Sequence, residues 1–255
     1  MKSIKKSKPA DPAFELKTDS FLPIAEHLHR YGKNNHIICL TDSKGYAQPD
    51  NKTVNEIRVD ASNGTIPLWD KDVTLNWRFN KSFGSFFKNG VAAKASIRKL
   101  FSEAIVAWGD ACPIKFHEDN DAWDFEITMH QKDCDQTGCV LAQSFFPGTS
   151  QNPFFIYPTM FEQSHQEQVE TIEHEMGHVF GLRHFFANIS EKGSKSELFG
   201  KDNAFSIMNY GDKSTLTADD KKDLKRLYDS VWNGTRTSIN GTKIKKFVSF
   251  TMRKQ

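Results

Sequence analysis

The sequence predicts a single α+β domain, because strand patterns come first along the chain and amphipathic helices follow them. Residues 73–79 alternate apolar and polar positions, which is the period of a half-buried strand. Residues 166–180 repeat apolar side chains at helical spacing and end at Gly181, where a glycine can close a helix. The patterning becomes clear from about residue 66, so we place the start of the domain there.

The other elements of the domain follow from the same two periods. Strands are expected at residues 114–117, 125–129, 139–146 and 154–157. The final helix begins at Thr217, and Asp220 three residues later gives it a capping-box-like start. A further helix is expected over residues 95–108, with an apolar stripe formed by Ile97, Leu100, Phe101, Ala104, Ile105 and Trp108.

Composition limits the classes of partner. The chain has 255 residues, of which 38% are hydrophobic, which is enough for a real core. Its 34 basic and 32 acidic residues give a net charge of +2, so nothing indicates the concentrated basic face of a nucleic-acid-binding protein. No apolar run reaches the roughly 18 residues that a membrane helix needs. We expect a monomer with no membrane span.

The two ends of the chain differ from its centre. Residues 1–65 are polar and weakly periodic, and we predict an N-terminal extension that wraps on the domain or acts as a pro-like segment. Residues 66–235 form the predicted domain, and residues 236–255 are assigned to a basic, solvated tail. The first 20 residues carry lysines but no apolar core and no small-residue cleavage site, so they are not a secretory signal.

The segment HEMGHVFGLRH, residues 174–184, carries the chemistry. On a helix, His174 and His178 are four residues apart and project from one face, so both imidazoles can reach one zinc ion. Gly181 ends the helix and lets His184 return as a third ligand. Three protein ligands leave one position open for water, which is typical of a catalytic zinc site.

The same segment predicts a reaction. Zinc lowers the pKa of its water towards about 7 and polarises a carbonyl group. Glu175 lies beside the expected metal position, where its carboxylate can take a proton from that water and deliver it to the leaving amine. We therefore predict one catalytic Zn²⁺ per chain and a hydrolase.

The extended motif HExxHxxGxxH, followed by SIMNY at residues 206–210, resembles the metzincin clan of zinc metalloproteases. The resemblance implies a twisted mixed sheet with an active-site helix, a Met-turn and a C-terminal helix. It also implies that Met208 forms a hydrophobic floor beneath the zinc. SIMxY is similar to astacins, which makes Tyr210 a fifth ligand or an oxyanion donor; a packed core tyrosine is the alternative.

Other segments resemble matrixins. These are IRKLFSEAIVAWGDACPIKF, CVLAQSFFPG and LTADDKKDLKRLY, and the likeness covers about residues 66–231. It implies a strand that binds an extended substrate peptide, or else a simple packed sheet edge, formed by Val140, Leu141, Ala142, Gln143, Ser144 and Phe145. Gln143 stands where matrixins carry a histidine for a second zinc, and Phe185 follows the third ligand. The resemblance therefore extends to the clan and not to one family.

These patterns together predict a zinc-dependent endopeptidase that cleaves internal peptide bonds of a protein or peptide substrate. A zinc amidase acting on cell-wall peptides is one alternative, because the motif does not determine the acyl group. A catalytically silent binding module is the other. A protease site without a secretory signal favours an effector or toxin secreted or delivered by a non-classical route, with a cytoplasmic protein as the alternative.

Three further features of the sequence bear on ions, redox state and latency. Acidic clusters at residues 119–124 and 133–135 could bind Ca²⁺, although neither has an EF-hand pattern. Cys39 or Asp50, in the N-terminal extension, could block the zinc in a latent form. Two disulfides or four buried thiols are both compatible with Cys39, Cys112, Cys134 and Cys139.

Overall fold

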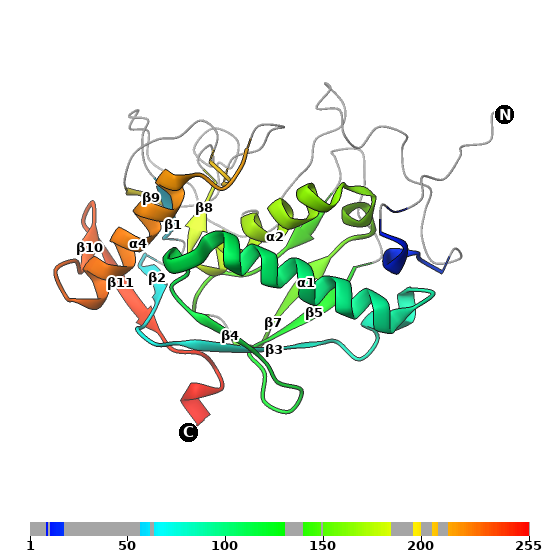
Figure 1. Ribbon diagram of the computed structural model, residues 1–255. Helices are drawn as coiled ribbons and strands as arrows, with labels where there is room; N and C mark the ends of the chain where they lie inside the picture. Colours follow the sequence, from blue (N-terminus) through cyan, green and yellow to red (C-terminus); the bar gives the residue numbers. More distant parts are fainter. Residues whose placement is uncertain are drawn as a thin grey trace.

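The central sheet of the protein has five strands in the order β4-β3-β5-β7-β6 (Figure 1). The computed structural model describes residues 9, 11–17, 57–61, 64–130, 140–148, 150–184, 196–199, 206–208 and 214–254. The first four strands in that order are parallel to their neighbours, and β6 is antiparallel to β7 at one edge. The strands are β3 (Thr74–Phe79), β4 (Lys115–Glu118), β5 (Phe125–Met129), β6 (Ala142–Gln143) and β7 (Asn152–Ile156). The fold is thus α+β with a mixed sheet, as predicted.

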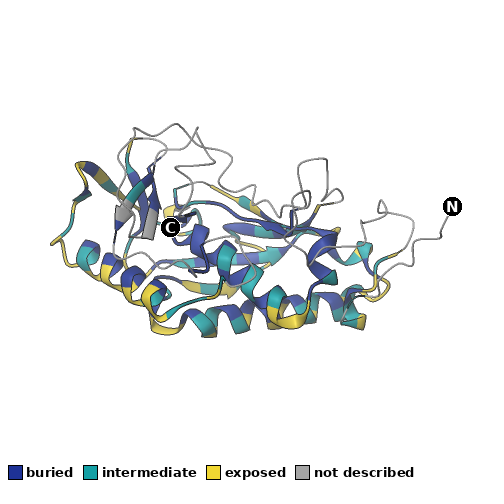
Figure 2. Ribbon diagram, turned by 90° about the horizontal axis from the view of Figure 1, so that it is seen from above, coloured by how far each residue is buried: buried dark blue, intermediate teal, exposed yellow. Residues whose placement is uncertain are grey.

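Two long helices lie on one face of this sheet, α1 (Gly90–Trp108) and α2 (His165–Val179) (Figure 1). Their exposed residues lie on the side away from the core (Figure 2). Helix α1 begins five residues before the predicted start, because Asn89 caps it by accepting the N–H of Ala92 at 3.0 Å. A Cβ on Gly90 would overlap the backbone of Gly84, so this glycine permits the close approach of the preceding turn.

Most strands of the central sheet lie within two residues of their predicted bounds, and the predicted strand 125–129 is matched at both ends. The prediction for residues 139–146 was too long, since only Ala142 and Gln143 are in strand conformation among those described. Among the described residues, β6 has a ladder partner on the β7 side alone, so hydrogen bonds along one edge only hold it in strand conformation. Directly after it, the Ser144 hydroxyl donates to the Glu175 carbonyl at 2.8 Å, so the chain turns to helix α2.

A second sheet has the order β8-β1-β9 and packs beside the end of α2. Its strands are β1 (Ile57–Asp60), β8 (Leu182–Arg183) and β9 (Ser196–Phe199), all antiparallel to their neighbours. The central strand, β1, comes from the segment that the sequence assigns to an N-terminal extension. That segment therefore contributes a strand beside the candidate ligands.

A third sheet joins the two ends of the described domain. Strand β11 (Thr242–Phe247) pairs with β10 (Ser238–Ile239) and runs parallel to β2 (Ile66–Trp69), with Ile244 opposite Ile66. Residues assigned to a basic tail thus include a strand that pairs with the start of the domain. Helix α4 (Ala218–Trp232) begins at Thr217 with the predicted capping box to Asp220. None of the described helices combines the length and the apolar character needed to cross a membrane.

Candidate metal centre

Helix α2 carries the first two candidate ligands. Ser164 begins it with a capping box, in which its hydroxyl accepts the N–H of Glu167 and the Glu167 carboxylate accepts the N–H of Ser164 at 2.8 Å. His174 and His178 lie one turn apart on the buried side, with ring centroids separated by 4.9 Å. The helix therefore presents both imidazoles in the same direction.

The three histidines converge as ligands of one ion would. The Nε2 atom of His174 lies 2.9 Å from Nε2 of His184 and 3.2 Å from Nε2 of His178. Two ligand nitrogens about 2.05 Å from a tetrahedral zinc lie about 3.3 Å apart, so the 3.2 Å separation matches such an ion and the 2.9 Å separation is about 0.4 Å shorter. Among the described residues, this is the one group of three or more histidine, cysteine or carboxylate side chains that could hold a metal.

Backbone carbonyl groups orient two of the imidazoles. Nδ1 of His174 lies 2.7 Å from the carbonyl oxygen of Ile207, and Nδ1 of His178 lies 2.8 Å from that of Leu182. Each Nδ1 therefore carries the proton and donates it, which leaves the lone pair of Nε2 free for a metal. Burial, with a smaller effect from the neighbouring histidines, lowers the pKa of His174 to about 3. The ring is therefore neutral at physiological pH, as a ligand must be.

Gly181 makes the turn that brings the third histidine back. Its φ is +90°, and its N–H donates to the His178 carbonyl at 2.8 Å. A Cβ at this position would lie 3.0 Å from the Pro67 carbonyl oxygen and 3.0 Å from a methyl group of Leu68, so a side chain is excluded by both conformation and space. Strand β8 then leads to His184, whose side chain is fully buried.

Met208 packs against helix α2 and belongs to residues 206–208, the described part of the segment predicted as the Met-turn. It is 1% exposed, and a Cβ built on Gly177 would overlap its sulfur atom. Gly177 thus lets the Met-turn approach the helix between the two helical ligands. Gly177 is not among the residues predicted for the site, although an isolated glycine inside a predicted amphipathic helix is a signal of close packing.

Asp220 holds the Met-turn to helix α4. Its carboxylate accepts the Ser206 hydroxyl at 2.5 Å and the Ile207 N–H at 3.3 Å, as well as the Thr217 hydroxyl at 2.8 Å and N–H at 2.9 Å. Ser206 also accepts the N–H of Met208 at 3.1 Å. Since the carbonyl of Ile207 orients His174, Asp220 supports the metal centre through the Met-turn. The capping box could be predicted from the sequence, but this second role could not.

Glu175 lies next to His174 on α2 and is 2% exposed. The predicted substrate strand contacts helix α2 at this residue, because the Ser144 hydroxyl donates to the backbone carbonyl of Glu175. Within that strand, Gln143 accepts a hydrogen bond from the Tyr157 hydroxyl at 3.3 Å. The six residues proposed for substrate binding, residues 140–145, are all buried. The structure thus places the candidate base and the edge strand side by side.

Several other predictions lie outside the described residues. These concern Tyr210, Phe185, Asp50, the acidic cluster at residues 133–135, and Cys39, Cys134 and Cys139. Cys112 is described and is a free thiol, whose sulfur lies 3.2 Å from the Ile114 carbonyl oxygen. The thiol alternative therefore applies to this cysteine.

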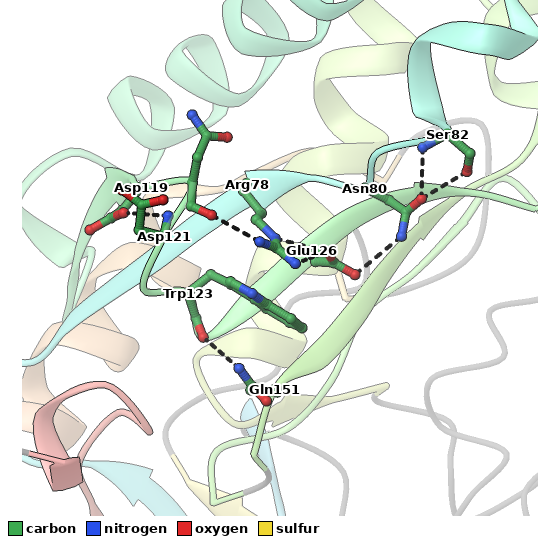
Figure 3. A network of polar contacts seen from close by, with 9 residues as sticks. Arg78, Asn80, Ser82, Asp119, Asp121, Trp123, Glu126 and Gln151 are labelled. Carbon is green, nitrogen blue, oxygen red and sulfur yellow. Dashed lines mark hydrogen bonds and ion pairs between the residues drawn. The ribbon is translucent and has the colours of Figure 1, made fainter.

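The acidic cluster at residues 119–124 is occupied by hydrogen bonds within the protein. Asp119 accepts the N–H of Asp121 at 2.8 Å (Figure 3) and the N–H of Ala122 at 3.1 Å. Asp124 accepts the N–H of Asn76 at 2.7 Å and the N–H and hydroxyl of Thr251 at 2.8 and 3.0 Å. The Asp119 carboxylate thus stabilises the turn at residues 119–122, and the Asp124 carboxylate holds Thr251, which follows β11.

The chain is similar to known proteins. A model of metallo-peptidase family M12 matches residues 74–218, more than half of the chain, including the three histidines. Stromelysin-3 from Homo sapiens is 28% identical over 148 residues, which span 53% of this chain and 28% of the human protein. A solved structure described as that of myroilysin covers 67% of this chain and 98% of its own, with 16% identity and a TM-score of 0.43.

The family match and the convergence of three histidines, two on helix α2 and one directly after strand β8, define a metzincin-like zinc protease domain. The chain belongs to metallo-peptidase family M12.

Proposed function

We propose that this protein is a zinc-dependent endopeptidase that hydrolyses internal peptide bonds of protein substrates. The observation that carries the proposal is the convergence of three Nε2 atoms, at separations of 2.9 and 3.2 Å, beside Glu175. Three neutral imidazoles form the donor set of a catalytic zinc with one open position. A zinc ion held there would activate a water molecule and polarise the scissile carbonyl group.

The residues of this chain carry out the remaining steps. The Glu175 carboxylate takes the proton from the attacking water and passes it to the nitrogen of the leaving amine. His174 and His178 keep their Nε2 lone pairs directed at the metal position, because each donates its Nδ1 proton to a backbone carbonyl. Tyr210, at the end of the SIMNY segment, is proposed to stabilise the developing oxyanion.

Strand β6 is proposed to align the substrate. Among the described strands, β6 pairs only with β7, so its other edge can accept the backbone of an extended peptide. Its following residue, Ser144, donates to the backbone carbonyl of Glu175, which supports a substrate path close to the proposed base. A peptide added to β6 is therefore proposed to run beside helix α2 near Glu175. Delivery outside the producing cell and a Ca²⁺ site remain predictions of the sequence.

The test is cleavage of a denatured protein and of a quenched peptide library by the purified chain, with and without a zinc chelator. We expect cleavage that the chelator abolishes and that added zinc restores. Glu175→Ala should lower kcat by at least about a hundred-fold, the order expected for general acid–base catalysis, while it still binds zinc. Glu170→Gln, on the same helix and half-buried, is the matched control and should retain activity.

The alternatives give different results in the same assay. Bound zinc without cleavage of any peptide, but with hydrolysis of cell-wall peptide amides, would indicate the amidase. Cleavage that survives Glu175→Ala would contradict the proposed base. A chain that binds no zinc at all would contradict the proposed function.

A further inference from the structure

A buried ion pair joins strand β1 to the segment between the second and third candidate ligands. Nη1 of Arg183 lies 3.0 Å from Oδ1 of Asp60, and the two side chains are 1% and 3% exposed. Arg183 directly precedes His184 in the sequence. Removing one partner of such a pair leaves an uncompensated charge in the protein interior. Loss of Asp60 would therefore act on the residue next to the third ligand.

Asp60 also holds the same segment through its backbone. Its N–H donates to the Gly181 carbonyl at 2.9 Å, and its neighbour Val59 is paired with Leu182 in the antiparallel ladder of β1 and β8. The Leu182 carbonyl in turn accepts the Nδ1 proton of His178. One residue of β1 thus contacts both ends of residues 181–183, which connect the helix to the third ligand.

The side chain of Arg183 is also tied to the second ligand. Its guanidinium carbon lies 5.4 Å from the centroid of the Phe146 ring. The same ring packs edge-on against His178, with centroids 5.5 Å apart. The position of the guanidinium is therefore coupled by packing to the imidazole of His178 and by the chain to His184.

We propose that Asp60 is a positioning residue of the metal centre, which sets the position of His184 through Arg183 and Gly181. The inference rests on the zinc site of the proposed function. Asp60 lies before residues 74–218, which match the family, so this contact is supplied by a segment outside the matched region. The strand that precedes the matched region then belongs to the working catalytic unit.

The test measures zinc affinity in the full chain, by competition with a chromophoric chelator, together with the absorption bands of the cobalt-substituted protein. Asp60→Asn and Arg183→Met should each weaken zinc binding about 10- to 100-fold, as is usual when a residue that orients ligands is lost. Their cobalt bands should also shift, because these bands report ligand geometry. Glu126→Gln is the matched control, since it breaks a half-buried ion pair to Arg78 of 2.8 Å on the central sheet (Figure 3). The control should lose stability and keep the zinc affinity of the parent chain.

The results separate this inference from the proposed function. A parent chain that binds no zinc would overturn the proposed function, and the inference with it. A parent that binds zinc while Asp60→Asn binds it equally tightly, with unchanged cobalt bands, would overturn the inference alone. Should Asp60→Asn not fold, as judged by circular dichroism, Arg183→Lys replaces it, because lysine keeps the charge but lacks the planar fork of donors. Zinc affinity equal to that of the parent in Arg183→Lys would equally overturn the inference.

Discussion

Replacing Asp220 with alanine removes the anchor of the Met-turn, and the structure allows the loss to be estimated. The Ser206 hydroxyl and the Ile207 N–H are buried donors that would lose their acceptor, at about 1–2 kcal/mol each. Loss of the capping box at Thr217 adds about 1 kcal/mol. We therefore expect the free energy of unfolding to fall by about 3–5 kcal/mol, which corresponds to a decrease in Tm of roughly 10 °C for a chain of this size.

Thermal unfolding of the metal-free protein, followed by circular dichroism, measures this loss without interference from zinc binding. Asp219→Ala is the matched control, because Asp219 lies in the same first helical turn but is exposed to solvent. Only its interaction with the helix dipole is lost, at about 0.5 kcal/mol. Equal destabilisation by the two variants would refute the reasoning, since it would mean that the carboxylate of Asp220 does not hold the Met-turn.

The pH dependence supplies a second check on Asp220. Burial raises the pKa of this carboxyl group above its ordinary value, against the opposing effect of its hydrogen bonds from Ser206, Thr217 and Ile207. The folded state therefore binds the proton of Asp220 more tightly than the unfolded state does. The resulting contribution to the free energy of unfolding is fully present below the ordinary pKa and is lost as pH rises through the raised pKa. Asp220→Asn cannot ionise, so the stability difference from the parent chain should be largest in acid and shrink as pH rises. A difference that grows with pH would contradict this direction.

Two further predictions concern Gly177 and Cys112. Gly177→Ala should push Met208 away from helix α2 and lower the free energy of unfolding by about 1–3 kcal/mol through overpacking. Denaturant unfolding measures this loss, and the double variant with Met208→Ala should recover part of it. No recovery in the double variant would contradict the proposed clash. Burial raises the pKa of the Cys112 thiol to about 11, so its thiolate fraction at pH 8 should be roughly a hundred-fold below that of an ordinary cysteine. Alkylation of its peptide, followed by mass spectrometry, should accelerate to that extent on unfolding; equal rates in the folded and unfolded chain would contradict the burial.

The candidate ligands could be predicted from the sequence because their signals are local. His174 and His178 are one helical turn apart, and Gly181 must end that helix for His184 to return. The capping box at Thr217 is equally local, and the structure has it as predicted. Each of these features depends on neighbours within a few residues, which a periodicity or a spacing can detect.

The support around the ligands could not be predicted in the same way. The carbonyl groups that orient His174 and His178 belong to Ile207 and Leu182, and any residue can supply a carbonyl. Strand β1 pairs with β8 and β9, which lie far along the chain, so its partners cannot be identified from its own four residues. Strand β11 carries three lysines, at positions 243, 245 and 246, and this charge favoured the interpretation as a solvated tail.

The pairing of β2 with β11 has a consequence for the order in which the molecule is completed. Trp69, in β2, donates its indole N–H to the Val179 carbonyl at 2.7 Å, at the end of the ligand-bearing helix. The carbonyl of Trp69 accepts the indole N–H of Trp232, in α4, at 3.2 Å. Strand β2 gains its parallel partner β11 only when Phe247 has been synthesised. A chain growing from its N-terminus therefore has His174, His178 and His184 before the scaffold that secures their helix. We expect proteolytic activity to appear only after strand β11 has been added to the growing chain, and not already when the three histidines are complete.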